Sequence, residues 1–186
     1  MAWYLLCDYW PSPEMSESFL QNSVMPAKAG KLKNSNRTLL RKMFIKAGLK
    51  PKKLNKDAWT DIYDVSGSLD GAKTLEVVFT KTDGRFAMGE YTFPSFMNAN
   101  QVQGIIELVS NKYGKPDDIE GNLALGPVKA IWRAGQMRIF VSRGWPDTTT
   151  YLTYVELENK AIVESEVEAY KYNKSHSKFE LQKNAV

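Results

Sequence analysis

A long stretch of the chain carries only positive charge. Between Glu17 and Asp57, residues 18–56 contain eleven lysine or arginine side chains and no acidic one. Unpaired charges are strongly disfavoured in a protein interior, so this stretch must lie at the surface or find counter-charges elsewhere in the fold. It limits which residues can build the core, and it predicts a surface of strong positive potential.

The charge is unevenly divided between the two parts of the chain. Residues 1–56 hold 11 basic and 3 acidic groups, a balance of +8, whereas residues 57–186 hold 14 basic and 18 acidic groups, a balance of −4. Such asymmetry is typical of proteins that bind nucleic acid or an acidic surface. The alternative is that the two parts of the chain face and neutralise each other.

Length and composition favour one soluble domain. The chain has 186 residues, of which 43% are hydrophobic, enough for a sizeable core. We expect a single domain over residues 1–172, with a basic loop–helix insertion at 10–56 and a polar, flexible tail at 173–186. The sequence has no apolar run of membrane-spanning length and no signal-peptide pattern, and Cys7 is its one cysteine. We therefore expect a cytoplasmic protein.

The clearest helix in the basic stretch is expected at residues 36–48. Ser35 or Asn36 can cap it, and Gly48 gives the usual end. Its apolar stripe comprises Leu39, Leu40, Met43, Phe44 and Ala47. We expect the stripe to dock on the core while the helix cations face solvent, followed by a mobile lysine-rich tail at 50–56.

The remaining pattern predicts strands and two more helices. Strands are expected at 2–9, 58–65, 73–81, 85–93 and 149–157, with a second hairpin turning near Ala134-Gly135. In the first hairpin, two-residue pairing sets Phe79 opposite Met88. Helices are expected at 98–113 and 158–172. Together these elements give an α+β fold, a mostly antiparallel sheet of about six strands with two helices on one face and the basic helix inserted after the first strand.

Residues for catalysis or metal binding are scarce. With one histidine, His176, and one cysteine, the chain cannot form a zinc site of nitrogen and sulfur ligands, and it has no phosphate-binding glycine loop. An enzyme using carboxylates alone is the remaining catalytic possibility, with Asp57, Asp61 and Asp64 as its best candidates. We expect no catalytic residues, no metal, no cofactor and no small-molecule substrate.

We therefore expect a non-catalytic binding protein whose basic helix and loop engage an anionic partner, foremost nucleic acid. Its candidate contact residues are Lys31, Lys33, Arg37, Arg41, Lys42, Lys46, Lys50, Lys52, Lys53 and Arg138. Arg138 is expected beside Lys129 and Phe140, on a basic and aromatic surface suited to single strands. The alternative is an adaptor or inhibitor that docks on an acidic surface of another protein, such as a nucleic-acid-handling complex.

Overall fold

The fold is an antiparallel sheet accompanied by helices. The computed structural model describes residues 32, 35–54, 58–94, 98–124, 126–146 and 149–183. Within them, eight strands form one sheet in the order β1-β2-β3-β4-β8-β7-β6-β5, with three helices. The α+β class is confirmed, with two more strands than expected. The predicted strand at 2–9 and almost all of the part of the predicted insertion that precedes its helix lie outside the described residues.

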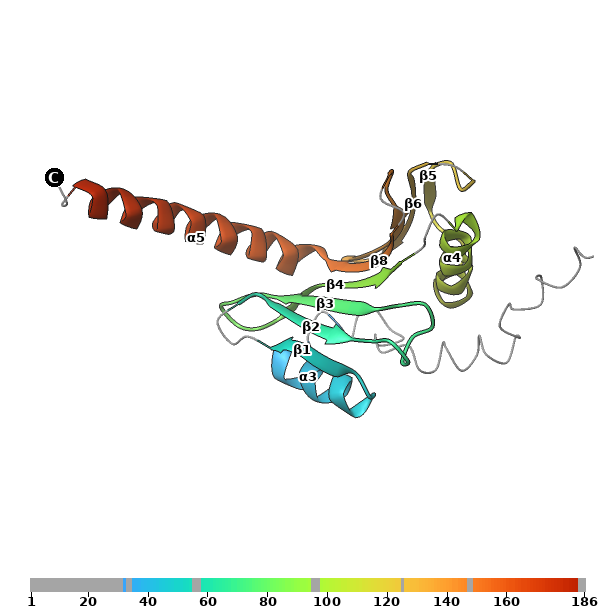
Figure 1. Cartoon of the computed structure of the whole chain (residues 1–186), viewed down its shortest axis with the longest axis horizontal. Helices are drawn as coiled ribbons and strands as arrows, with labels where there is room; N and C mark the ends of the chain where they lie inside the picture. Colours follow the sequence, from blue (N-terminus) through green and yellow to red (C-terminus); the bar gives the residue numbers. More distant parts are fainter. Residues whose placement is uncertain are drawn as a thin grey trace, which may run out of the picture.

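The elements repeat a simple unit along the chain. In order they are α3 (Arg37–Lys46), β1 (Lys50–Leu54), β2 (Thr60–Asp64), β3 (Thr74–Phe79), β4 (Phe86–Phe93), α4 (Ala99–Tyr113), β5 (Asp118–Gly121), β6 (Val128–Ala134), β7 (Met137–Arg143), β8 (Thr150–Glu156) and α5 (Leu157–Lys183). A helix followed by four antiparallel strands thus occurs twice. The two units join where β4 pairs with β8, which leaves β1 and β5 at opposite ends of the sheet (Figure 1).

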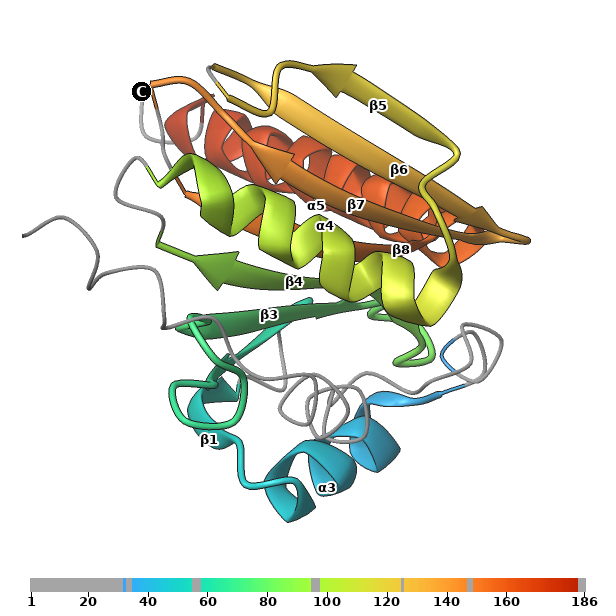
Figure 2. The same cartoon turned by 90° about the vertical axis from the view of Figure 1, so that its right-hand side faces the viewer.

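The two faces of the sheet are covered differently. Residues of α3 and α4 share the main core with alternate residues of the strands, such as Val77 and Ile139. On the opposite side, Val163 of α5 packs with Val78 and Ala87 in a separate small cluster. Figure 2 shows α4 in front of the sheet and α5 behind it. We call these sides the α4 face and the α5 face. The expectation that the two later helices share one face is wrong.

Both hairpins differ in register from the expectation. In the first, Val78 pairs with Met88 and Phe79 with Phe86, because the strands are joined by a longer turn and the register shifts between Val78 and Phe79. Met88 consequently packs on the α5 face rather than in the main core. In the second, Ala134 pairs with Met137 across a turn at Gly135, one residue later than expected.

The two unpredicted strands are the ends of the sheet. All residues of β1 and β5 are exposed, so neither has the alternation of apolar and polar residues that identifies a half-buried strand. The segment predicted as a mobile lysine-rich tail instead pairs with β2 through residues 50–54. Hydrogen bonding to a neighbouring strand, not burial, defines both elements.

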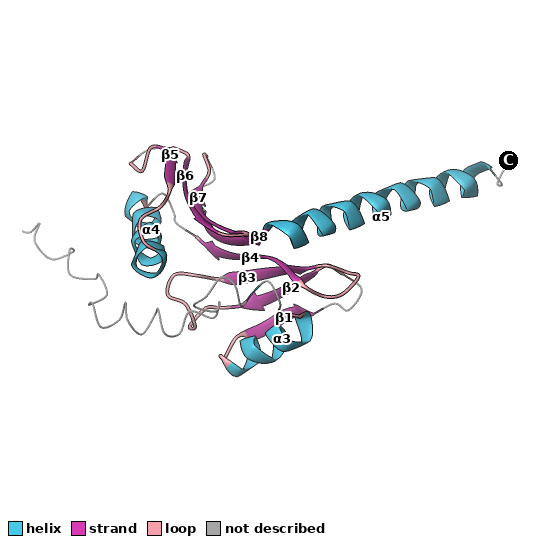
Figure 3. Ribbon diagram, turned by 180° about the vertical axis from the view of Figure 1, so that it is seen from behind, coloured by secondary structure: helices cyan, strands magenta, loops and turns pink. Residues whose placement is uncertain are grey.

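Helix α5 begins on the sheet and then leaves it. It was expected to end at residue 172, but it continues to Lys183, projecting from the body (Figure 3). Residues 173–183, which were expected to belong to a polar tail, are thus part of this helix. No glycine or proline interrupts this segment, so local helix propensity permits the extension.

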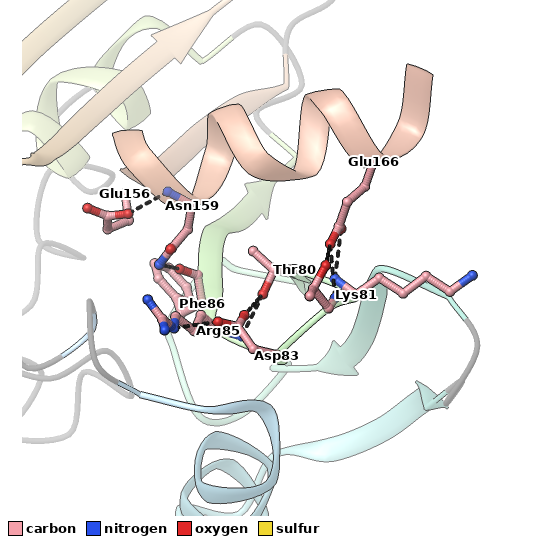
Figure 4. A network of polar contacts seen from close by, with 9 residues as sticks. Thr80, Lys81, Asp83, Arg85, Phe86, Glu156, Asn159 and Glu166 are labelled. Carbon is pink, nitrogen blue, oxygen red and sulfur yellow. Dashed lines mark hydrogen bonds and ion pairs between the residues drawn. The ribbon is translucent and has the colours of Figure 1, made fainter. Parts of the chain in front are cut away.

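Side chains at the start of α5 fix the helix to the β3–β4 turn (Figure 4). Glu156 Oε2 accepts a hydrogen bond from Asn159 N at 2.7 Å, and Asn159 Nδ2 donates to Phe86 O at 2.8 Å. Two turns later, the carboxylate of Glu166 accepts hydrogen bonds from Trp59 Nε1, from the backbone of Lys81 and from Thr82. These contacts hold the first half of α5, and its continuation takes its direction from them.

Candidate anion-binding surface

Helix α3 forms where the sequence predicts it, and two of its cations turn inward. Asn36 caps the helix, its side chain accepting a hydrogen bond from Leu39 N at 2.9 Å. Leu40 and Phe44 are fully buried, and the Phe44 ring packs edge-on against Tyr63 with centroids 5.2 Å apart. Of the predicted apolar stripe, Leu39 and Met43 are exposed. The helix therefore docks through a narrow apolar contact, and the remainder of its anchor is ionic.

Arg37 and Arg41, one helical turn apart, converge on the carboxylate of Asp61 in β2. Asp61 Oδ1 is 2.7 Å from Nη2 of each arginine, and Oδ2 lies 3.2 Å from Arg37 Nε and 2.8 Å from Arg41 Nε. Arg37 also donates to Ala58 O at 2.7 Å, and its guanidinium lies 5.2 Å from the centre of the Phe79 ring. Each arginine thus donates two hydrogen bonds to the carboxylate, one to each oxygen. This bidentate geometry suits the planar guanidinium of arginine and not the ammonium of lysine.

The electrostatics of this cluster stabilise the charged form of Asp61, which is fully buried. Burial by itself raises the pKa of the Asp61 carboxyl, but the hydrogen bonds and charges of Arg41 and Arg37 outweigh burial and leave that pKa below its ordinary value. The hydrogen bond to Asp61 in turn raises the pKa of Arg41. Burial raises the pKa of neighbouring Tyr63 to about 12.

The expectation that all helix cations face solvent is therefore wrong for Arg37 and Arg41. Their charges are largely neutralised by a buried carboxylate, so they hold the helix on the sheet. Sequence reasoning identified Asp61 only as a possible catalytic carboxylate. Asp61 lies inside a strand, on the same side as the buried Tyr63 and opposite to Ile62. This position in the sequence gave no sign of which residues its carboxylate would pair with.

The lysines of α3 and β1 do face solvent. We call them the basic edge, and its members are Lys42, Lys46, Lys50, Lys52 and Lys53. Within the described residues, Lys52 is the one member with an ion-pair partner, Asp64 at 3.2 Å, and both side chains of that pair are partly exposed. The basic edge belongs to β1, the outermost strand at its end of the sheet, and to α3, the helix beside that strand (Figure 1).

Other predicted site residues lie apart from the basic edge. Lys31 and Lys33 fall outside the described residues. Arg138 lies on β7, five strands away from β1 or about 24 Å at the usual strand spacing. There it donates hydrogen bonds to Gly135 O at 2.6 Å and Met137 O at 3.0 Å. Arg138 therefore does not extend the basic edge.

A second basic region surrounds Arg138 on the α5 face. The Lys129 ammonium lies 4.8 Å from the centre of the Phe140 ring, and Arg133 pairs directly across from Arg138. The expected mixed basic and aromatic surface on this hairpin is confirmed. Arg143, at the end of β7, does not belong to this surface, because it is buried and donates to the backbone oxygens of Leu123 and Gly126.

The candidate carboxylates do not converge. Asp57 lies outside the described residues, while Asp61 and Asp64 extend from opposite sides of β2, as the alternation of buried and half-buried residues shows. Hydrogen bonds from Ser66 and the nearby Lys52 lower the pKa of the exposed Asp64 to about 2. Across the described residues, no group of three or more histidine, cysteine, aspartate or glutamate side chains is placed to hold a metal ion.

Sequence reasoning also missed a cation–π cluster beside α5. The Lys81 ammonium lies 5.1 Å from the ring centre of Trp59 and 5.8 Å from that of Tyr170, and the two rings meet edge to face at 5.6 Å. Trp59 and Tyr170 are 111 positions apart in the sequence, too far for a pattern to connect them. With Glu166, they line a shallow groove where α5 leaves the body.

No protein-family model matches the sequence, and no curated protein matches it. Among solved structures, the fold is similar to the crystal structure of a DUF4309 family protein (YjgB) from Bacillus subtilis subsp. subtilis str. 168. The two are 13% identical, with a TM-score of 0.44, and the match covers 77% of this chain and 96% of that chain. In the described part of this chain, no helix has the length and apolarity needed to cross a bilayer.

Proposed function

We propose that the protein is a non-catalytic binding protein whose basic edge contacts an anionic partner, and that this partner is nucleic acid. The observation that carries the proposal is the division of cations around α3. Arg37 and Arg41 are occupied by Asp61, whereas the lysines of the basic edge extend into solvent. Their charge is available to a partner at little cost in lost internal contacts.

The chemistry of lysine favours phosphate contacts without base recognition. An ammonium is a compact point charge on a flexible stem, so it attracts phosphate without the fixed geometry that arginine imposes. Contacts to phosphates give affinity that is independent of sequence and falls as salt rises, because bound counterions are released. We therefore propose that the basic edge binds the nucleic-acid backbone with little sequence preference.

Replacing four lysines tests this function. In a variant with Lys42, Lys46, Lys50 and Lys53 changed to Gln, affinity for an oligonucleotide at low salt should fall by at least tenfold, and the dependence on salt should flatten. The matched control changes Lys73, Lys115, Lys171 and Lys174, which are exposed elsewhere, and removes the same charge. Equal losses in the two variants would mean that only net charge matters. Unchanged binding in the first variant would overturn the proposal.

A second candidate function is an adaptor that binds another protein. It is supported by the projecting half of α5, where residues 168–177 are all exposed. A helix held at its base and free beyond it suits insertion into a partner's groove. Pull-down with and without nuclease separates the two candidates, since only a nucleic-acid-mediated complex is lost on nuclease treatment.

A further inference from the structure

The two ends of the sheet carry opposite charges in matching patterns. We propose that copies of the chain join end to end, with β1 of one copy pairing with β5 of the next to extend the sheet. This inference goes beyond the proposed function, and its partner is a second copy of this chain. The two strands are suited to this pairing in their exposure, in the faces on which their side chains lie, in their directions and in their register.

Both end strands are open. Every residue of β1 and of β5 is exposed, and within the described residues each strand pairs with one neighbour, β2 or β6. A strand with one neighbour presents a row of backbone N–H and C=O groups to solvent on its outer side. Such a row can pair with another strand.

The side chains of β1 are sorted by face. Lys50 and Lys53 pair with Asp64 and Ile62, which lie on the α5 face, whereas Leu54 pairs with Asp61 on the α4 face. Leu54 is 40% exposed. The end strand β1 is therefore basic on one face and has an uncovered leucine on the other.

The side chains of β5 are sorted in the same way with the opposite charge. Asp118 and Glu120 pair with Ile131 and Lys129 on the α5 face, whereas Ile119 pairs with the core residue Ala130 on the α4 face. Ile119 is 46% exposed. Each end strand thus has an uncovered aliphatic side chain on the α4 face, and their α5 faces carry opposite charges.

The directions of the strands permit this pairing without turning either copy over. All neighbouring strands are antiparallel, and there are eight of them, so β1 and β5 run in opposite directions within one copy. A second copy in the same orientation therefore brings its β5 antiparallel to β1, with equivalent faces aligned. A register that sets Leu54 opposite Ile119 also sets Lys53 opposite Glu120. One arrangement satisfies both the apolar and the ionic contact.

Another role for a lysine-rich end strand is protection, because lysine and proline at a sheet edge hinder pairing between molecules. Pro51 removes one backbone donor from β1, and the register of β1 shifts beside it. If the lysines of β1 served only to prevent pairing between molecules, the acidic residues of β5 would have no part in association. Under our proposal, lysines repel a second β1 and select β5, and the head-to-tail contact produces chains or a closed ring.

Two charge-reversed variants test the proposal, measured by sedimentation velocity on nuclease-treated protein over a range of concentrations. One is Lys50→Glu with Lys53→Glu, and the other is Asp118→Lys with Glu120→Lys. Wild type should form larger species as concentration rises. Each variant alone has end strands of like charge and should remain a monomer, whereas an equimolar mixture should assemble again, because each end then meets its opposite.

The mixture distinguishes loss of charge complementarity from a folding defect. Circular dichroism shows whether each variant is folded. Two folded variants that are monomeric alone should assemble when mixed, because the charges of their end strands are then complementary. Wild type that stays monomeric at every concentration, variants that assemble alone as wild type does, or a folded mixture that stays monomeric would each overturn the proposal. Failure of the proposed function is separate. The Asp118→Lys, Glu120→Lys variant should lose assembly and still bind an oligonucleotide through its unaltered lysines.

Discussion

The two helix-and-four-strand units have the same order of elements but fix their helices differently. In the second unit, α4 docks through an apolar stripe of Val102, Ile105, Ile106 and Val109, each at most 7% exposed. In the first unit, α3 has two buried apolar side chains, Leu40 and Phe44, and its two arginines bind Asp61. One helix is therefore held by burial of apolar area, and the other by a small apolar contact with an ionic cluster.

This difference shows how a strongly basic helix can be docked on a core. An all-apolar face would leave every cation of α3 outside, where like charges repel. Pairing Arg37 and Arg41 with one buried carboxylate removes two charges from that repulsion and adds directional hydrogen bonds. The exposed lysines then form a surface on a helix whose position is fixed. We therefore expect the stability of the two units to respond differently to loss of a charge, to loss of apolar volume and to a fall in pH.

The largest effect is expected from Asp61→Asn. The change removes the charge that two partly buried arginines share, and breaking a buried ion pair on one side costs about 3–5 kcal/mol. The free energy of unfolding, measured by urea denaturation at neutral pH, should fall by that amount. Asp64→Asn is the matched control on the same strand, and its exposed pair with Lys52 should contribute little. Similar small losses in both variants would show that α3 does not depend on the ionic cluster.

Ile106→Ala tests the apolar anchor of the second unit. Ile106 is 7% exposed, and truncation to alanine loses buried area and leaves a cavity, at a cost of about 3 kcal/mol. Because no charge is involved, the loss should be the same at low and high salt, whereas the loss for Asp61→Asn should depend on salt. Gln103→Ala, on the solvent side of α4, is the matched control and should lose little stability. A strong salt dependence for Ile106→Ala would contradict the distinction.

Acid should weaken the first unit selectively. The folded pKa of Asp61 lies below its ordinary value, so its stabilising contribution is fully present above the unfolded pKa of about 4 and is lost as pH falls through the lower folded pKa. Urea unfolding of wild type and Asp61→Asn should therefore converge as pH falls below about 4. Asp64, whose pKa is also lowered, is present in both proteins, so the difference between them belongs to Asp61. Parallel curves across that range would contradict the assignment.

The smallest effects are expected where the two units are alike. Both helices begin with an asparagine cap, Asn36 accepting from Leu39 N and Asn98 accepting from Asn100 N. Asn36→Ala and Asn98→Ala should each lower the free energy of unfolding by about 1 kcal/mol, because each leaves one helix N–H without its partner. Unequal losses would show that the apolar anchor of α4 or the ionic anchor of α3 compensates for a missing cap.

Much of this fold is predictable from the sequence where local signals are strong. The bounds of α4 agree with the helix expected at 98–113, and α3 starts after Asn36 as expected. The exposed strands β1 and β5 could not be predicted in this way, because pairing with a neighbour leaves no periodic pattern when both sides of a strand face solvent. The register of the first hairpin failed for a related reason, since a shift at Val78 moves Met88 to the other face.

The candidate site was only partly predictable. A run of lysines and arginines fixes the sign of a surface, but it does not distinguish the cations that fold inward from those that remain outside. That distinction at Arg41 and Lys42 depends on Asp61, twenty residues away from Arg41 in the sequence. Helical spacing places Arg37 and Arg41 on one side of α3. The Asp61 carboxylate that binds them, however, can be identified only from the tertiary structure.

The most direct test of this division is the affinity for an oligonucleotide of two neighbouring single variants, Arg41→Gln and Lys42→Gln, under conditions where both are folded. Lys42→Gln should weaken binding and lower the salt slope by about one, because it removes one phosphate contact. Arg41→Gln should leave affinity and slope unchanged, since its charge is already bound to Asp61. Weaker binding in Arg41→Gln with unchanged binding in Lys42→Gln would contradict the account.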